Sequence, residues 1–92
     1  MYLARIKEII QKHLPAEEFR LFVFGSRAKG QFSQWSDIDV GIWGKKRIRG
    51  SALVNIEEEL ENSRIPYRVE IVDFNRVSED FKEVALQSII NL

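Results

Sequence analysis

Residues 21–40 read LFVFGSRAKGQFSQWSDIDV, and this stretch decides the fold. Leu21 to Phe24 form a four-residue apolar run that Gly25 ends, which is typical of a short buried strand. The next dozen residues, rich in Gly, Ser and Gln, predict an irregular or partly helical connection. A second strand follows, because apolar residues then alternate with polar or small ones. The apolar set is Ile38, Val40 and Ile42, and the other set is Asp37, Asp39 and Gly41.

Helical patterns flank these strands on both sides. Apolar residues at helical spacing predict a helix over residues 2 to 13, which Pro15 ends. Ser51 is the predicted N-cap of a second helix, with Leu53, Val54, Ile56 and Leu60 facing inward. A third strand is expected from Tyr67 to Val72. Ser78 is the predicted N-cap of a last helix that buries Phe81, Val84, Ala85 and Ile89.

The expected fold class is therefore α/β (α+β), a small mixed sheet of about three strands flanked by helices. With 92 residues, 45% of them hydrophobic, we expect one domain over residues 1–92. The absence of cysteine excludes disulfides and thiolate metal sites and fits the cytoplasm. No apolar run approaches the ~20 residues of a membrane span, and the charged first residues do not resemble a signal peptide.

Charge is sorted along the chain, although the formal net charge is zero. Residues 1–50 hold ten basic and five acidic side chains, and residues 51–92 hold four and nine. The balanced total argues against a protein that coats nucleic acid or binds a membrane surface. The basic stretch Lys45–Arg49 is either a solvated loop or a contact for pyrophosphate or an acceptor.

A candidate anion site follows the first strand. Gly25 and Ser26 end the strand directly, and Gly30 lies five residues beyond Gly25, with Arg27 and Lys29 between them. A glycine there lets the backbone approach a ligand closely, so that N–H groups, the Ser26 hydroxyl and a cationic side chain can meet phosphate oxygens. The alternative is an ordinary turn between two elements.

Three carboxylates form the candidate metal site. Asp37 and Asp39 are one residue apart, so a strand places both side chains on one face. Hard Mg²⁺ prefers such oxygens, whereas the alternative has Asp37 capping a turn and Asp39 on a solvated face. Glu70 lies mid-strand on a partly polar face and joins the pair if the two strands are neighbours. Asp73 is better placed as a strand-end residue.

In these elements the chain resembles the minimal nucleotidyltransferase family of the DNA polymerase beta-like superfamily. The resemblance rests on Gly25-Ser26-Arg27-Ala28-Lys29-Gly30, Ser36-Asp37-Ile38-Asp39-Val40 and Val69-Glu70-Ile71-Val72-Asp73-Phe74, in the family's order. It implies a palm-like sheet and transfer of a nucleoside monophosphate, AMP from ATP, to a hydroxyl acceptor.

The resemblance also implies roles for single residues. Gly25 and Ser26, with Arg27 and Lys29, would hold the triphosphate. Asp37 and Asp39 would bind two Mg²⁺ ions, Glu70 would complete the catalytic metal site, and Glu70 or a water would accept the acceptor's proton. Glu70 departs from the aspartate that many relatives carry, which adds one methylene.

Partners follow from the resemblance as well. Minimal members of the family are commonly paired with a small helical HEPN-domain protein in toxin–antitoxin-like arrangements, so a HEPN protein is the expected acceptor, ahead of RNA or a small molecule. The alternative is a non-catalytic module that binds nucleotide or masks its HEPN partner. Apolar Ile89, Ile90 and Leu92 suggest a homodimer or partner contact. His13 is expected at the surface or at a helix end, and Trp35 either stacks on a base or is simply exposed.

Overall fold

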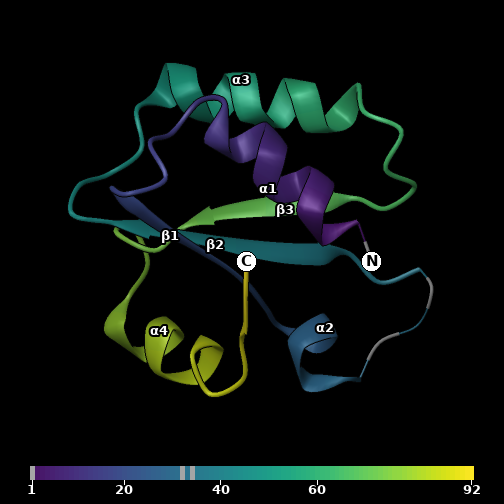
Figure 1. Cartoon of the computed structure of the whole chain (residues 1–92). Helices are drawn as coiled ribbons and strands as arrows, with labels where there is room; N and C mark the ends of the chain where they lie inside the picture. Colours follow the sequence, from purple (N-terminus) through teal and green to yellow (C-terminus); the bar gives the residue numbers. More distant parts are fainter. Residues whose placement is uncertain (1, 32, 34) are drawn as a thin grey trace.

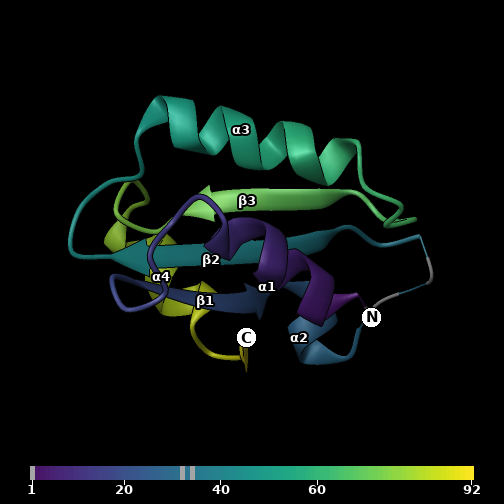
Figure 2. The ribbon, with the colours of Figure 1, turned by 45° about the horizontal axis from the view of Figure 1, so that its top comes forward.

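A mixed sheet organises the chain in the computed structural model, which describes residues 2–31, 33 and 35–92. Its strands are β1 (Phe19–Phe24), β2 (Ile38–Gly44), β3 (Val69–Asp73) and β4 (Ile90–Asn91), in the order β3-β2-β1-β4. β1 pairs antiparallel with β2 and with β4, whereas β2 and β3 are parallel. Figure 2 shows β3, β2 and β1 side by side. The predicted mixed-sheet fold class is confirmed.

Helices cover the two faces of the sheet unequally. Helices α1 (Leu3–Gln11) and α3 (Gly50–Glu61) lie over one face, and α2 (Ser26–Lys29) and α4 (Glu79–Ala85) lie under the other (Figure 1). Because α2 and α4 are short and stand apart, the second face is covered only in part. No helix of the described ranges is long and apolar enough to cross a membrane.

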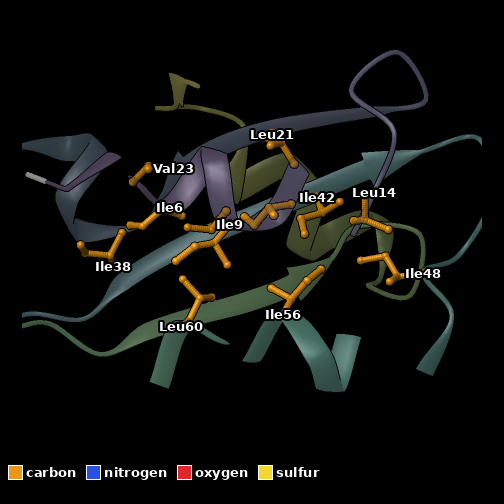
Figure 3. Close-up of a cluster of buried hydrophobic side chains, with 12 residues drawn as sticks. Ile6, Ile9, Leu14, Leu21, Val23, Ile38, Ile42, Ile48, Ile56 and Leu60 are labelled. Atoms are coloured by element: carbon orange, nitrogen blue, oxygen red, sulfur yellow. The ribbon is translucent and has the colours of Figure 1, made fainter. Parts of the chain in front are cut away.

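The main core lies between the sheet and the α1/α3 layer (Figure 3). Alternate residues of each strand point into it, as the period of two requires. Its fully buried members include Ile6, Ile9, Ile10, Val23, Ile38, Val40, Ile42 and Ile56. Burying such side chains contributes roughly 1.5–3 kcal/mol each, so this face supplies most of the stability.

A smaller aromatic cluster packs on the opposite face. The rings of Phe22 and Phe74 meet edge to face with centroids 4.8 Å apart, and Phe24 lies 5.2 Å from Phe74. Gly41 of β2 makes room for them, because a Cβ there would lie 2.5 Å from the Phe22 ring. Ala85 of α4 closes the cluster. The cluster anchors α4 and leaves the face near α2 uncovered.

Several predictions about single elements are wrong. Helix α3 begins at Gly50 after the N-cap Arg49, so Ser51 is not the cap, and Val54 is 53% exposed. In α4 only Ala85 is buried, because a seven-residue helix presents one narrow stripe; Phe81 and Val84 remain exposed. Ser78 does cap α4, its hydroxyl accepting from Phe81 N at 3.1 Å.

The fourth strand was not expected. Ile90 and Asn91 pair with Val23 and Phe22 of β1, and Leu92 N donates to Leu21 O at 3.0 Å. Ile90 and Leu92 pack against the main core and Ile89 against the aromatic cluster. These apolar residues are therefore used within the chain, which removes the reason for expecting a homodimer through them.

Candidate active site

The strand register brings the candidate residues to one end of the sheet. Phe24, the last residue of β1, lies opposite Asp39, and Asp39 lies opposite Glu70. Because β1 is antiparallel to β2, the last residues of β1 lie beside the first residues of β2. Because β3 is parallel to β2, the first residues of β3 lie there as well. The turn that starts at Gly25 therefore meets Asp39, and Glu70 lies on the other side of Asp39. The predicted neighbourhood of β2 and β3 is confirmed.

Gly25 is required by its contact with Asp39. It has φ 74° and ψ −152°, a combination that is essentially restricted to glycine. A Cβ at this position would lie 2.6 Å from Oδ2 of Asp39, well inside contact distance. The backbone of the turn thus rests directly against the carboxylate, which only a glycine allows.

The turn itself is a single helical turn between two glycines with positive φ. Helix α2 spans Ser26–Lys29, and Gly30 ends it in the left-handed conformation with φ 72°. Gln31 N donates to Ser26 O at 3.0 Å and closes the turn. First-turn N–H groups of a helix lack intrahelical partners, so this turn presents donors beside the carboxylates. Lys29 is exposed and Ser26 half-buried.

Arg27 does not extend toward solvent as a phosphate ligand would. Its side chain is buried, and Nη2 donates to the carbonyl oxygen of Ser36 at 2.7 Å. The guanidinium lies 4.5 Å from the ring centroid of Tyr67. Arg27 thus ties α2 to the residue before Asp37 and to the segment before β3, while its backbone N–H stays in the turn. Sequence patterns carry no signal for this contact, because Tyr67 is forty residues away.

Asp39 lies beside two other carboxylates. Burial raises the pKa of Asp39 above the ordinary aspartate value, and the Glu70 and Asp37 carboxylates beside it raise this pKa further. Asp37 is half-buried just before β2. Glu70 keeps half of its side chain exposed, with Arg68 Nη2 at 3.7 Å from its Oε1. Unbalanced negative charge therefore gathers at Asp39.

The donor set fits a divalent cation that is completed by substrate. Among the described residues, no three His, Cys, Asp or Glu side chains already surround one point as a metal cluster. Mg²⁺, however, is usually held by one or two carboxylates together with water and substrate phosphates. A cation between Asp39 and its two neighbours would also relieve the repulsion that raises the Asp39 pKa.

Two other candidates lie away from this centre. The basic stretch Lys45–Arg49 follows the far end of β2, where Lys45 lies about 20 Å from Asp39 at ~3.3 Å per residue. Asp73, at the same far end, accepts from Ile48 N and Asn75 N at 2.9 Å each and fixes that loop. Its strand-end role is confirmed.

The remaining candidates are peripheral. His13 lies at the end of α1, where its Nε2 is 3.0 Å from Oε1 of Glu59 on α3. Lys12 also bonds Glu59, and these hydrogen bonds lower the Glu59 pKa. His13 therefore links two helices, as its surface position suggested. Trp35 is 82% exposed in the segment that leads to Asp37.

Comparison with known proteins places this geometry in context. The family model described as "Polymerase beta, Nucleotidyltransferase" matches residues 4–92. A protein named "Probable protein adenylyltransferase MntA", from Haemophilus influenzae, is 34% identical over 82 residues, which are 89% of this chain and 70% of that relative.

Solved structures show the same fold. A toxin–antitoxin complex with AMP-PNP contains a chain that matches with TM-score 0.81 at 19% identity, over 99% of this chain and 72% of that chain. A complex of a tri-AMPylated Shewanella oneidensis HEPN toxin with MNT antitoxin contains a chain that matches with TM-score 0.71 at 17% identity, over 96% of this chain and 66% of that chain. At such identities the likeness concerns the fold.

The contact between Gly25 and Asp39 can be tested with a glycine pair. Gly25→Ala and Gly30→Ala both place Cβ at positive φ. This costs roughly 1–3 kcal/mol of stability at position 25, where the backbone conformation is essentially restricted to glycine, and ~1–2 kcal/mol at the left-handed position 30. Only the Cβ at position 25 meets Asp39, because nothing lies within 4 Å of position 30. We expect nucleotidyl transfer to fall on the order of 10²-fold in Gly25→Ala and to change little in Gly30→Ala. Equal transfer rates in the two variants would contradict the proposed contact.

The crowding at Asp39 predicts that the site costs stability. Because the folded-state pKa of Asp39 is raised, its charged form destabilises the fold, and the penalty appears as pH rises through that pKa. At neutral pH without divalent ions, Asp39→Asn should therefore unfold at a higher temperature than wild type. The gain in the free energy of unfolding is at most about 1 kcal/mol, because this group is partly exposed. The difference should vanish below the ordinary aspartate pKa, and thermal scans at both pH values measure it. A less stable variant at neutral pH would refute the crowding.

Proposed function

Because this chain belongs to the polymerase beta nucleotidyltransferase family, we propose that it transfers AMP from ATP to a hydroxyl group of a HEPN-type partner protein. The observation that carries the proposal is the contact of the glycine turn with Asp39, which pairs in register with Glu70 on the neighbouring strand. The MntA relative, named as a probable protein adenylyltransferase, supports the protein acceptor.

The proposed reaction is a displacement at the α-phosphorus of ATP. The acceptor oxygen forms a bond to this phosphorus, the bond to the oxygen that bridges to the β-phosphorus breaks, and pyrophosphate leaves. N–H groups of the turn and the Ser26 hydroxyl are suited to bind the phosphates, with Lys29 adding charge. Glu70, half exposed beside Asp39, is placed to take the acceptor's proton, or a water takes it.

Asp37, Asp39 and Glu70 are the residues that would hold magnesium, with two ions proposed. When bound, Mg²⁺ lowers the pKa of the acceptor hydroxyl and stabilises charge on the leaving pyrophosphate. Arg27 has an indirect part: its contact with the Ser36 carbonyl holds the segment from which Asp37 projects. The extra methylene of Glu70 is accommodated because this side chain lies at the open edge of the sheet.

The partner proposal rests on the neighbours. One structural neighbour is described as an MNT antitoxin in complex with an AMPylated HEPN toxin. We therefore propose that this chain modifies a HEPN protein in a toxin–antitoxin-like pair, and that the pair acts in the cytoplasm. A second candidate function is neutralisation by binding alone, favoured by the exposed Trp35 next to the site, since an exposed indole is a frequent contact residue.

The test incubates the purified chain with a HEPN-domain protein from the same genome. Incubation with ATP and Mg²⁺ should add the mass of one or more adenylyl groups to that protein in intact mass spectra. Asp37→Asn and Asp39→Asn should abolish the addition, since each removes a carboxylate from the site, and both should remain folded by circular dichroism.

Glu83→Gln, an exposed carboxylate on α4, is the matched control and should keep full transfer. If the wild-type chain binds the HEPN protein and suppresses its activity with no mass added, binding alone is the function. Undiminished transfer by Asp39→Asn would refute the metal site.

A further inference from the structure

A groove runs along the outer side of β3, beneath the edge of α3. It encloses about 640 Å³. Figure 2 shows α3 lying along β3. Its lining combines apolar residues of both elements, Leu60, Val69 and Ile71, with the exposed carboxylates Glu57 and Glu61 of α3. Strand β3 forms one wall along the groove. The groove is therefore better suited to an extended polypeptide than to a small charged ligand.

Strand β3 offers unpaired backbone groups to this groove. It is the first strand in the order β3-β2-β1-β4, so its other side faces no strand of the described chain. Arg68 O accepts from Ile38 N, and Phe74 N donates to Ile42 O, so even-numbered residues bond toward β2. By alternation, Val69 and Ile71 direct their N–H and C=O groups outward. An added strand can bond to both.

Glu70 joins the groove to the active site. It lines the groove, and it is also the neighbour whose carboxylate raises the pKa of Asp39. Any residue placed opposite Glu70 on an added strand projects its side chain to the face that carries Asp39. Its Cβ would lie about 4.5–5.5 Å from that of Glu70.

We propose that the open edge of β3 binds an extended segment of the acceptor protein as an added antiparallel strand, with the acceptor hydroxyl opposite Glu70. The proposal rests on the proposed function and specifies how the acceptor is presented. Antiparallel pairing makes Glu70 a non-hydrogen-bonded position, where facing side chains approach most closely. Asp39 lies two strand spacings away, about 10 Å, so a long hydroxyl-bearing side chain such as tyrosine is required.

The groove also selects the residues beside the acceptor. Neighbours of the acceptor residue point to the α3 side, where Glu57 and Glu61 form the rim. Lysine or arginine at these two positions would meet glutamates and avoid Arg68, which points to the other face. The expected acceptor segment is therefore extended, and its hydroxyl-bearing residue lies between two basic residues.

A synthetic peptide tests the docking without ATP. The probe is acetyl-Thr-Val-Lys-Tyr-Lys-Val-Thr-amide, added to isotope-labelled wild-type protein. We expect the amide signals of Val69 and Ile71 to shift and their hydrogen exchange to slow, with saturation that gives a Kd. The matched peptide with both lysine amides N-methylated lacks the donors for Val69 and Ile71 and should bind at least about tenfold more weakly.

A charge swap on α3 provides the second control. Glu61→Lys should weaken binding of the lysine peptide at least about threefold and favour a peptide with glutamates in place of its lysines. Glu58→Lys changes the charge of the same helix outside the groove and should alter neither. These variants leave the carboxylates of the active site in place.

The outcomes separate docking from chemistry. Equal binding of the two peptides, or shifts confined to residues outside the groove, would overturn the added strand even if the HEPN protein is adenylylated. Conversely, binding that follows both controls supports the groove even if no AMP is transferred. Adenylylation of the HEPN protein at an unchanged rate by Glu57→Lys/Glu61→Lys would also contradict this presentation.

Discussion

The contact between the Gly25 backbone and the Asp39 carboxylate is the constraint on which the site depends. β1 ends opposite Asp39, so the chain must leave the sheet just where the carboxylate stands. A Cβ at position 25 would lie too close to Oδ2 of Asp39, and the backbone of a residue other than glycine would be strained at φ 74°. Glycine removes both problems, and the turn that follows places its N–H groups beside the carboxylates. The proposed phosphate-binding turn and the proposed cation site are therefore joined through one residue.

One face of the sheet supplies most of the stability, and the other face carries the candidate active site. The face under α1 and α3 buries a continuous aliphatic core, whereas the opposite face holds a compact aromatic cluster and leaves its other end open. At that open end Glu70 and Asp37 lie beside Asp39. Burial, together with these two carboxylates, raises the Asp39 pKa, so the charged form of Asp39 is unfavourable in the fold. A site that destabilises its own fold in this way is common where activity requires crowded charge. The core on the far face offsets that cost.

Local patterns predicted most of the sheet, because period-two alternation and a glycine stop are properties of a few adjacent residues. The polar faces of the two strands allowed Glu70 to join Asp39 only if the strands were neighbours, and the structure supplies that condition. The fourth strand was missed because two residues, Ile90 and Asn91, are too short to show a period. The predicted burial of Val54 and Phe81 was wrong. Helical spacing identifies the apolar face of a helix but not how much of that face the neighbouring elements cover. The contacts of Arg27 and the distance of the basic loop from the site depend on long-range geometry alone.

The sorting of charge along the chain has little to do with this site, which draws Asp37 and Asp39 from the basic half and Glu70 from the acidic half. What matters is that β2 and β3 bring them together. The most direct measurement is a crystal structure of the wild-type chain with Mn²⁺ and a non-hydrolysable ATP analogue, with anomalous scattering to locate the metal. The account predicts anomalous peaks coordinated by Asp37 and Asp39, with the triphosphate on the turn from Gly25. Nucleotide bound elsewhere, or metal peaks away from these carboxylates, would contradict it.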